Sequence, residues 1–143
     1  MYLNPRIVGS GERTLVLSHG YGGSQAIWDM VLPHLARRNK VRSIYLAAYC
    51  KLIGLDLICA CINHVRAVQV LLFDWDFSSA PDAGEEGYTF SRFADELVAL
   101  MDEMKLSGAV YVGHSMAGMV GCIASVKRPD LFAHLVLVAA SPR

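Results

Sequence analysis

The stretch Val110-Tyr111-Val112-Gly113-His114-Ser115-Met116-Ala117-Gly118-Met119-Val120 decides the fold of this chain. The apolar run at 109–112 predicts a short buried strand, and residues 116–127 predict a helix, with a tight turn between them. This is the strand–turn–helix context of the pattern G-x-S-x-G, which places a serine at the apex of a strained turn. The sequence therefore predicts that Ser115 is a nucleophile whose hydroxyl is lifted above a sheet.

The residues around this serine agree with that interpretation. The positions two before and two after it must be small, because the strand and the helix pass close to each other there. Gly113 meets this requirement, and Ala117 is a small departure from glycine that Gly118 follows. The backbone N–H of Met116 lies at the predicted helix N-terminus, where partial positive charge favours an oxyanion. The residues expected to support the turn are Gly113, His114 and Ala117.

A second glycine-rich loop, His19-Gly20-Tyr21-Gly22-Gly23, follows a predicted strand at 14–18. In serine hydrolases of this architecture such a loop supplies the second oxyanion donor, which here is the backbone N–H of Tyr21. A phosphate-binding loop is the alternative interpretation. Neither G-x-G-x-x-G after Ser18 nor G-x-x-x-x-G-K-S/T occurs, so we predict no nucleotide site.

The remaining segments alternate between strands and helices. Ser24 is a predicted N-cap for a helix toward Leu35 that Pro33 bends or divides. A helix at 91–104 carries an apolar face, with its acids, including Glu96, on the other face. This alternation predicts an α/β fold with a mostly parallel, doubly wound sheet in one domain. The strands that we expect lie at 6–9, 14–18, 70–74, 109–112 and 135–139.

Composition limits the classes of partner. The 143 residues carry 13 basic and 13 acidic side chains, so no basic patch predicts nucleic-acid binding. Four cysteines are too few and too unevenly spaced for a disulfide scaffold. The N-terminus has no apolar signal-peptide core, and we expect a cytoplasmic or nuclear location. We predict no metal, no cofactor and no membrane attachment.

Five segments together resemble the strigolactone and karrikin receptor family of plant α/β-hydrolases. The sequence Phe73-Asp74-Trp75 is similar to the pattern of its DWARF-fourteen-like-two branch. The resemblance covers 4–41 and 70–143, and it implies the N-terminal part of an α/β-hydrolase fold. The segments that carry the resemblance are 4–11, 17–22, 73–75, 111–116 and 124–132.

The resemblance also implies a function and a set of site residues. Members of this family bind small butenolide-type lactones, hydrolyse them slowly through a serine and signal through partner proteins. By resemblance Ser115 is the nucleophile, and the backbone N–H groups of Tyr21 and Met116 form the oxyanion hole. His19 and Gly20 are implied to hold the geometry of the oxyanion loop.

Residues 42–69 depart from the family, whose strand would run from Val41 directly into Leu71. We interpret this apolar segment as an atypical insertion, and a retained intron would account for it. A membrane helix at 44–62 is disfavoured, because Lys51 and Asp56 lie in its middle. A metal site at the cysteines is disfavoured too, because no fourth ligand is suitably spaced. The residues considered for that metal site are Cys59, Cys61 and His64.

The end of the chain is the second departure. In α/β-hydrolases an acid and then a histidine follow the nucleophile, together with further strands and a helical lid. Downstream of Ser115 the sequence holds His134 and Asp130, which we interpret as a core or surface histidine and a turn residue. We therefore expect a partial core whose serine lacks its acid and its base. The alternatives are a non-catalytic hormone-receptor-like protein and an inert truncated fragment.

Overall fold

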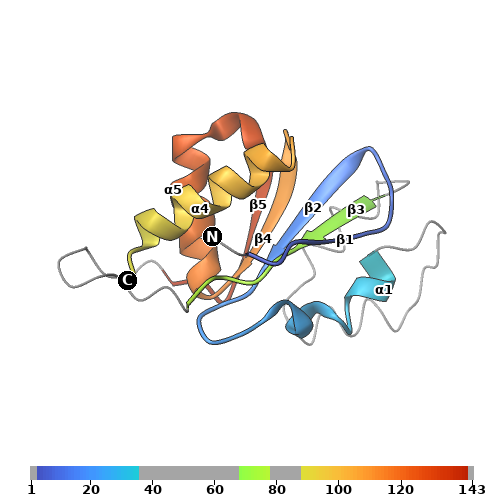
Figure 1. The fold of residues 1–143 in the computed structure, drawn as a ribbon, viewed down its shortest axis with the longest axis horizontal. Helices are drawn as coiled ribbons and strands as arrows, with labels where there is room; N and C mark the ends of the chain where they lie inside the picture. The colour runs from blue at the N-terminus through green and yellow to red at the C-terminus, as the bar shows by residue number, and fades with distance from the viewer. Residues whose placement is uncertain (1–2, 36–67, 78–87, 142–143) are drawn as a thin grey trace.

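A computed structural model describes residues 3–35, 68–77 and 88–141 of the chain. It contains a five-stranded sheet in the order β1-β3-β2-β4-β5 (Figure 1). The strands are β1 (Arg6–Val8), β2 (Arg13–Ser18), β3 (Val68–Leu72), β4 (Ala109–His114) and β5 (Phe132–Val138). The helices are η1 (Gln25–Trp28), α1 (Leu32–Leu35), α4 (Phe90–Glu103), α5 (Met116–Lys127) and η2 (Pro129–Leu131), of which η1 and η2 are 3₁₀ helices.

The sheet is mostly parallel, as the sequence predicted. β2 pairs in parallel with both β3 and β4, and β4 pairs in parallel with β5, whereas β1 runs antiparallel to β3. Ser18 at the end of β2 pairs with Gly113 near the end of β4. The two glycine-rich loops that follow these strands therefore meet at the same edge of the sheet, which is where open α/β sheets place their sites.

Helices cover both faces of the sheet, which confirms the doubly wound arrangement (Figure 1). One buried cluster joins α4 and α5 to side chains such as Val16 and Tyr111. The other joins η1 and α1 to the alternate positions of the same strands, such as Leu17 and Val112. Successive side chains of a strand point to opposite faces, so apolar residues at consecutive positions fill both layers.

The predicted helix from Ser24 toward Leu35 is divided into η1 and α1, and Pro33 lies in the first turn of α1. Proline is tolerated there, because its missing N–H would have no partner inside the helix. Ser24 occupies the N-cap position, but its side chain makes no capping hydrogen bond. The predicted N-cap position of Ser24 is therefore confirmed, but the side-chain acceptor of the first free N–H comes from another residue, Asp74.

Two further expectations need correction. β3 begins at Val68 and ends at Leu72, two residues earlier than predicted, so Asp74 lies beyond the strand. Val68 and Gln69, the last residues of the proposed insertion, pair with β2, and residues 42–67 lie outside the described part. Glu96 is buried, although the helix pattern placed it on the solvent face, and its Oε1 accepts from Nε of Arg92, one turn earlier, at 3.2 Å.

Candidate active site

Ser115 lies at the junction of β4 and α5 in a strained conformation. Its φ and ψ are 55° and −121°, a region that L-residues other than glycine rarely adopt. Such strain costs roughly 1–3 kcal/mol and persists only where the surroundings hold it. The Ser115 N–H donates to the carbonyl of Val138 on β5 at 2.9 Å, and the side chain is exposed. The turn therefore presents the hydroxyl at the edge of the sheet.

The structure explains the small residues around the serine. A Cβ built on Gly113 would lie 2.6 Å from the carbonyl oxygen of Ala117 and 2.7 Å from the N of Gly118. Both are backbone atoms, so no side-chain movement would relieve the overlap. The Ala117 methyl is itself buried without conflict, which accounts for the departure from glycine at that position.

The loop after β2 packs directly against the serine turn. A Cβ built on Gly20 would lie 3.0 Å from Ser115 Cβ and 3.1 Å from His114 Nδ1. The carbonyl of Gly20 accepts hydrogen bonds from Gly23 N–H at 3.2 Å and from His19 Nδ1 at 2.8 Å. In a planar trans peptide the C=O and the next N–H point in opposite directions. Fixing the Gly20 carbonyl inside the loop therefore turns the N–H of Tyr21 outward.

The two predicted oxyanion donors are both available for hydrogen bonding. Within the described part of the chain, the backbone N–H groups of Tyr21 and Met116 have no acceptor. Met116 is the first residue of α5, where the helix leaves its N–H groups unsatisfied and carries partial positive charge. The geometry thus brings the predicted donor loop, the predicted nucleophile and a helix N-terminus together.

His19 is buried and both of its ring nitrogens are engaged. Nδ1 lies 2.8 Å from the Gly20 carbonyl, and Nε2 lies 3.3 Å from the backbone N of Trp75. Because a carbonyl accepts and an amide N–H donates, these contacts require a neutral ring with its proton on Nδ1. Nε2 also lies 3.5 Å from Asp74 Oδ1, but an unprotonated nitrogen forms no ion pair there. This ring is therefore committed to the loop and has no nitrogen free to act as a base.

Asp74 is the residue that sequence reasoning missed. Its Oδ1 accepts from the Gln25 N–H at 2.7 Å and thereby caps η1, while Oδ2 accepts from Gln25 Nε2 at 2.8 Å and Asn4 Nδ2 at 3.3 Å. Burial alone would raise the pKa of Asp74, but the hydrogen bonds from Gln25 and Asn4 outweigh it and lower the pKa. The neighbouring Trp75 donates from Nε1 to the His19 carbonyl at 2.9 Å. Asp74 and Trp75 thus hold both ends of the loop.

Aromatic side chains line the region next to this loop. Tyr21 is 77% exposed, and its ring meets Phe77 edge-on at a centroid distance of 5.0 Å. Phe77 in turn contacts Phe93 at 5.6 Å, and Tyr88 stacks on Phe93 at 5.9 Å. An apolar aromatic surface beside a polar reaction centre is typical of small-molecule sites.

The downstream candidates lie far from Ser115. His134 is exposed and pairs with Val110 at the opposite end of β4 and β5. His134 lies four positions before Val138, the partner of Ser115, which corresponds to roughly 13 Å along a strand. Asp130 forms an exposed pair of hydrogen bonds with Arg128 at 2.9 and 2.8 Å. His134 and Asp130 are therefore surface residues, and neither completes a triad in this structure.

Comparison with known proteins agrees with this geometry. Residues 13–143 match the family model described as alpha/beta hydrolase fold. The chain belongs to this hydrolase family. A hydrolase from Pseudomonas aeruginosa PA01 shares the fold with a TM-score of 0.66 and 24% identity, over 96% of this chain and 41% of that structure.

Two plant relatives within the hydrolase family confirm the resemblance to strigolactone and karrikin receptors. Strigolactone esterase D14 of Arabidopsis thaliana is 33% identical over 141 residues, or 99% of this chain. Karrikin insensitive 2 receptor CA of Petunia hybrida is 35% identical over 140 residues, or 98% of this chain. The chain spans 43% of the length of each of these relatives. The DWARF-fourteen-like-two branch stays a prediction.

Two other expectations concern membranes and metals. Among residues 3–35, 68–77 and 88–141, no helix has both the length and the apolar character needed to cross a bilayer. The segment 44–62 and the residues Cys59, Cys61 and His64 lie outside these ranges.

Proposed function

We propose that this chain carries the nucleophile and the oxyanion hole of a serine α/β-hydrolase that binds a small butenolide-type lactone. In this proposal Ser115 is the nucleophile, and the N–H groups of Tyr21 and Met116 receive the oxyanion. His19, Gly20, Gly113, His114 and Ala117 support these three groups.

One observation carries the proposal. The strained Ser115 lies between two backbone N–H groups that have no acceptor among the described residues, one in the loop after β2 and one at the start of α5. Pre-positioned donors of this kind stabilise charge that develops on a carbonyl oxygen during acyl transfer. A packing turn alone would not require the Gly20 backbone to approach the serine this closely.

The names of two relatives support the proposed ligand class. One is named Strigolactone esterase D14 and another Karrikin insensitive 2 receptor CA, and both align with nearly the whole chain. A lactone carbonyl offers the electrophile that such a serine needs, and the paired aromatic rings of Tyr21 and Phe77 beside the loop support an apolar contact with the lactone ring. Signalling through partner proteins in the cytoplasm or nucleus extends the same proposal.

A non-catalytic receptor is the second candidate, and the histidines favour it. A serine hydroxyl is a weak nucleophile without a base. His19 is fully hydrogen-bonded within its loop, and His134 lies at the far end of the sheet. Neither of these two histidines is therefore placed to act as a base for Ser115, and on this second candidate the 143-residue chain binds a lactone rather than turning it over. An inert fragment is the third candidate.

The test combines binding and turnover on the 143-residue chain. A synthetic butenolide is titrated while the amide resonances are followed, and its hydrolysis is compared between the chain and its Ser115→Ala variant. Shifts at Tyr21 and Met116 without Ser115-dependent hydrolysis support the receptor. Shifts together with Ser115-dependent hydrolysis support the enzyme. Saturating butenolide that leaves both amides unmoved would reject the proposed site and favour the inert fragment.

We also propose that residues 42–69 are an insertion relative to the family. Sequencing the messenger RNA across the codons for Lys40 to Val70 tests this directly. A spliced message that joins Val41 to Val70 or Leu71 supports a retained intron. A message that always contains the segment rejects that origin.

A further inference from the structure

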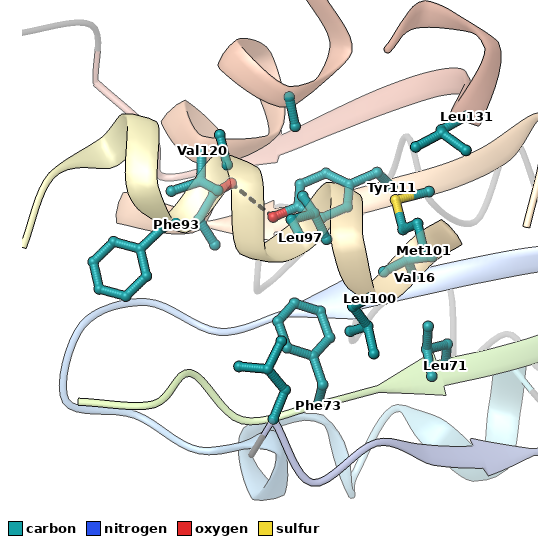
Figure 2. Close-up of a cluster of buried hydrophobic side chains, with 14 of the residues drawn as sticks. Val16, Leu71, Phe73, Phe93, Leu97, Leu100, Met101, Tyr111, Val120 and Leu131 are labelled. Carbon is teal, nitrogen blue, oxygen red and sulfur yellow. Dashed lines mark hydrogen bonds between the residues drawn. The ribbon is translucent and has the colours of Figure 1, made fainter. Parts of the chain in front are cut away.

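The buried side of the serine turn holds an interaction that the G-x-S-x-G motif does not contain. The hydroxyl of Tyr111 on β4 donates to the carbonyl of Ala117 in the first turn of α5, at 2.8 Å (Figure 2). Tyr111 is completely buried. This hydrogen bond ties the strand that precedes the serine to the helix that follows it.

The ring of Tyr111 occupies space that α5 leaves for it. A Cβ built on Gly121 would overlap Cε1 of the ring and lie 2.7 Å from Cδ1, so this position must be glycine for the ring to fit. In an α-helix the Ala117 carbonyl also accepts from the N–H of residue 121. The Tyr111 side chain therefore contacts both residues, Ala117 and Gly121, that this helical hydrogen bond joins.

The phenol remains a hydrogen-bond donor across the working pH range. Burial raises the pKa of Tyr111 well above its ordinary value, while the nearby Ser18 hydroxyl acts in the opposite direction. The ring packs edge-on against Phe132 of β5 at a centroid distance of 5.9 Å. Tyr111 thus links β4, α5 and β5, the three elements that hold Ser115.

We propose that Tyr111 is a positioning residue that sets the direction of the first turn of α5 and, through it, the Met116 N–H relative to Ser115. The effect of Tyr111 on the chemistry of Ser115 rests on the proposed function, whereas its effect on the first turn of α5 does not. The strained serine must be held from outside, and its own contacts are the bond from its N–H to Val138 and the bond from Gly118 N–H to its carbonyl. The Tyr111 bond acts at Ala117, two residues after Ser115, on the turn that carries the oxyanion donor.

The test uses Tyr111→Phe, which removes the hydroxyl and keeps the ring. The matched control is Ser125→Ala, which removes another hydroxyl that donates to a carbonyl of α5, that of Cys122 at 2.8 Å, but at the far end of the helix. Amide hydrogen exchange is measured by NMR on the 143-residue chain. We expect exchange at Ser115, Gly118 and Gly121 to accelerate about tenfold in Tyr111→Phe and to remain unchanged in Ser125→Ala.

The chemical consequence is measured with phenylboronic acid as the probe. The Ser115 oxygen forms a bond to the trigonal boron and its proton passes to solvent, which gives a tetrahedral boronate that ¹¹B NMR detects. The oxyanion donors stabilise this species, so we expect Tyr111→Phe to weaken adduct formation roughly tenfold or more. Ser115→Ala sets the background signal.

The outcomes separate the inference from the proposed function. Faster exchange confined to the serine turn together with a weaker adduct supports both. Unchanged exchange at the turn, or acceleration spread evenly along α5, overturns the positioning role. Faster exchange at the turn with no Ser115-dependent adduct in the unmodified chain supports the positioning role and rejects the proposed chemistry.

A second variant, Gly121→Ala, applies if Tyr111→Phe does not fold. Its added methyl displaces the Tyr111 ring and keeps the hydroxyl, so we expect the same amides to exchange faster. Unchanged exchange rates at these amides would overturn the positioning role.

Discussion

The carboxylate of Asp74 caps the backbone N–H of Gln25 at 2.7 Å, although 49 residues separate the two in sequence. The same carboxylate binds the Gln25 side chain at 2.8 Å, so a residue beyond β3 fixes the end of the loop that carries Tyr21. The stability of η1 and the geometry of the predicted oxyanion loop therefore both depend on the side chain of Asp74.

Replacing this side chain tests that dependence. Asp74→Ala removes the acceptor of the η1 cap and should lower the free energy of unfolding by about 1–2 kcal/mol, measured by urea denaturation at neutral pH. Asp74→Asn keeps one acceptor for the Gln25 N–H and should lose less. Asp29→Ala, which breaks an exposed ion pair with Arg6, is the matched control. A loss under about 0.5 kcal/mol for Asp74→Ala would contradict the capping role.

The pKa of Asp74 predicts how stability responds to acid. Its hydrogen bonds lower the folded-state pKa below the ordinary value of 3.8, so the unfolded chain binds the proton more readily. The stabilisation is complete above pH 3.8 and is lost as the pH falls through the lower folded-state value. Urea midpoints of the chain and of Asp74→Asn should therefore converge as the pH decreases below about 4. Curves that stay parallel would show that Asp74 is not the titrating group.

Glu96 should have the opposite effect on the pH dependence. Burial raises its pKa above the ordinary value of 4.5, although the hydrogen bond and the charge of Arg92 oppose this. The folded state therefore binds the proton more readily, and stability rises as the pH falls through the raised pKa toward 4.5. We expect Glu96→Gln to remove this rise and to leave stability at neutral pH unchanged or higher. Thermal unfolding of both proteins between neutral pH and pH 4.5 checks the sign.

Gly113 should tolerate no side chain, whereas Gly108 should tolerate one at modest cost. The Gly113→Ala methyl would overlap main-chain atoms of Ala117 and Gly118, so we expect a loss of about 3 kcal/mol or more. Gly108 has a φ of 57° with open space around it, so Gly108→Ala should cost about 1–2 kcal/mol from backbone strain alone. Denaturant unfolding compares the two, and equal losses would contradict the close packing of β4 against α5.

Ester hydrolysis tests whether the described histidines assist Ser115. We expect the 143-residue chain to cleave a nitrophenyl ester no faster than its Ser115→Ala variant. His19 is engaged in its loop, and His134 lies roughly 13 Å along the strand, so neither is placed to act as the base. His134→Ala should leave the rate unchanged. A burst that depends on Ser115 would show that a base reaches the serine, and its loss in His134→Ala would identify that base.

The sequence alone determined the architecture and the reactive turn. Periodicity and apolar runs predicted the parallel sheet with helices on both faces, because a strand buried on both sides must be apolar at every position. The bounds of α5 were predicted at Met116 and Lys127, since the glycines around Ser115 leave little freedom over where the helix begins. The structure adds that β2 and β4 are parallel neighbours, so the two glycine-rich loops leave the same edge of the sheet.

Only the tertiary structure decided what holds those loops. The cap on η1 comes from Asp74 rather than from Ser24, and the helix after the serine is held by Tyr111; neither contact has a local pattern in the sequence. Helix periodicity placed Glu96 in solvent, yet it is buried, and its Oε1 accepts from Nε of Arg92. Local sequence fixes backbone conformation through sterics and periodicity. Long-range hydrogen bonds depend on which elements become neighbours, and this is settled only when the sheet is assembled.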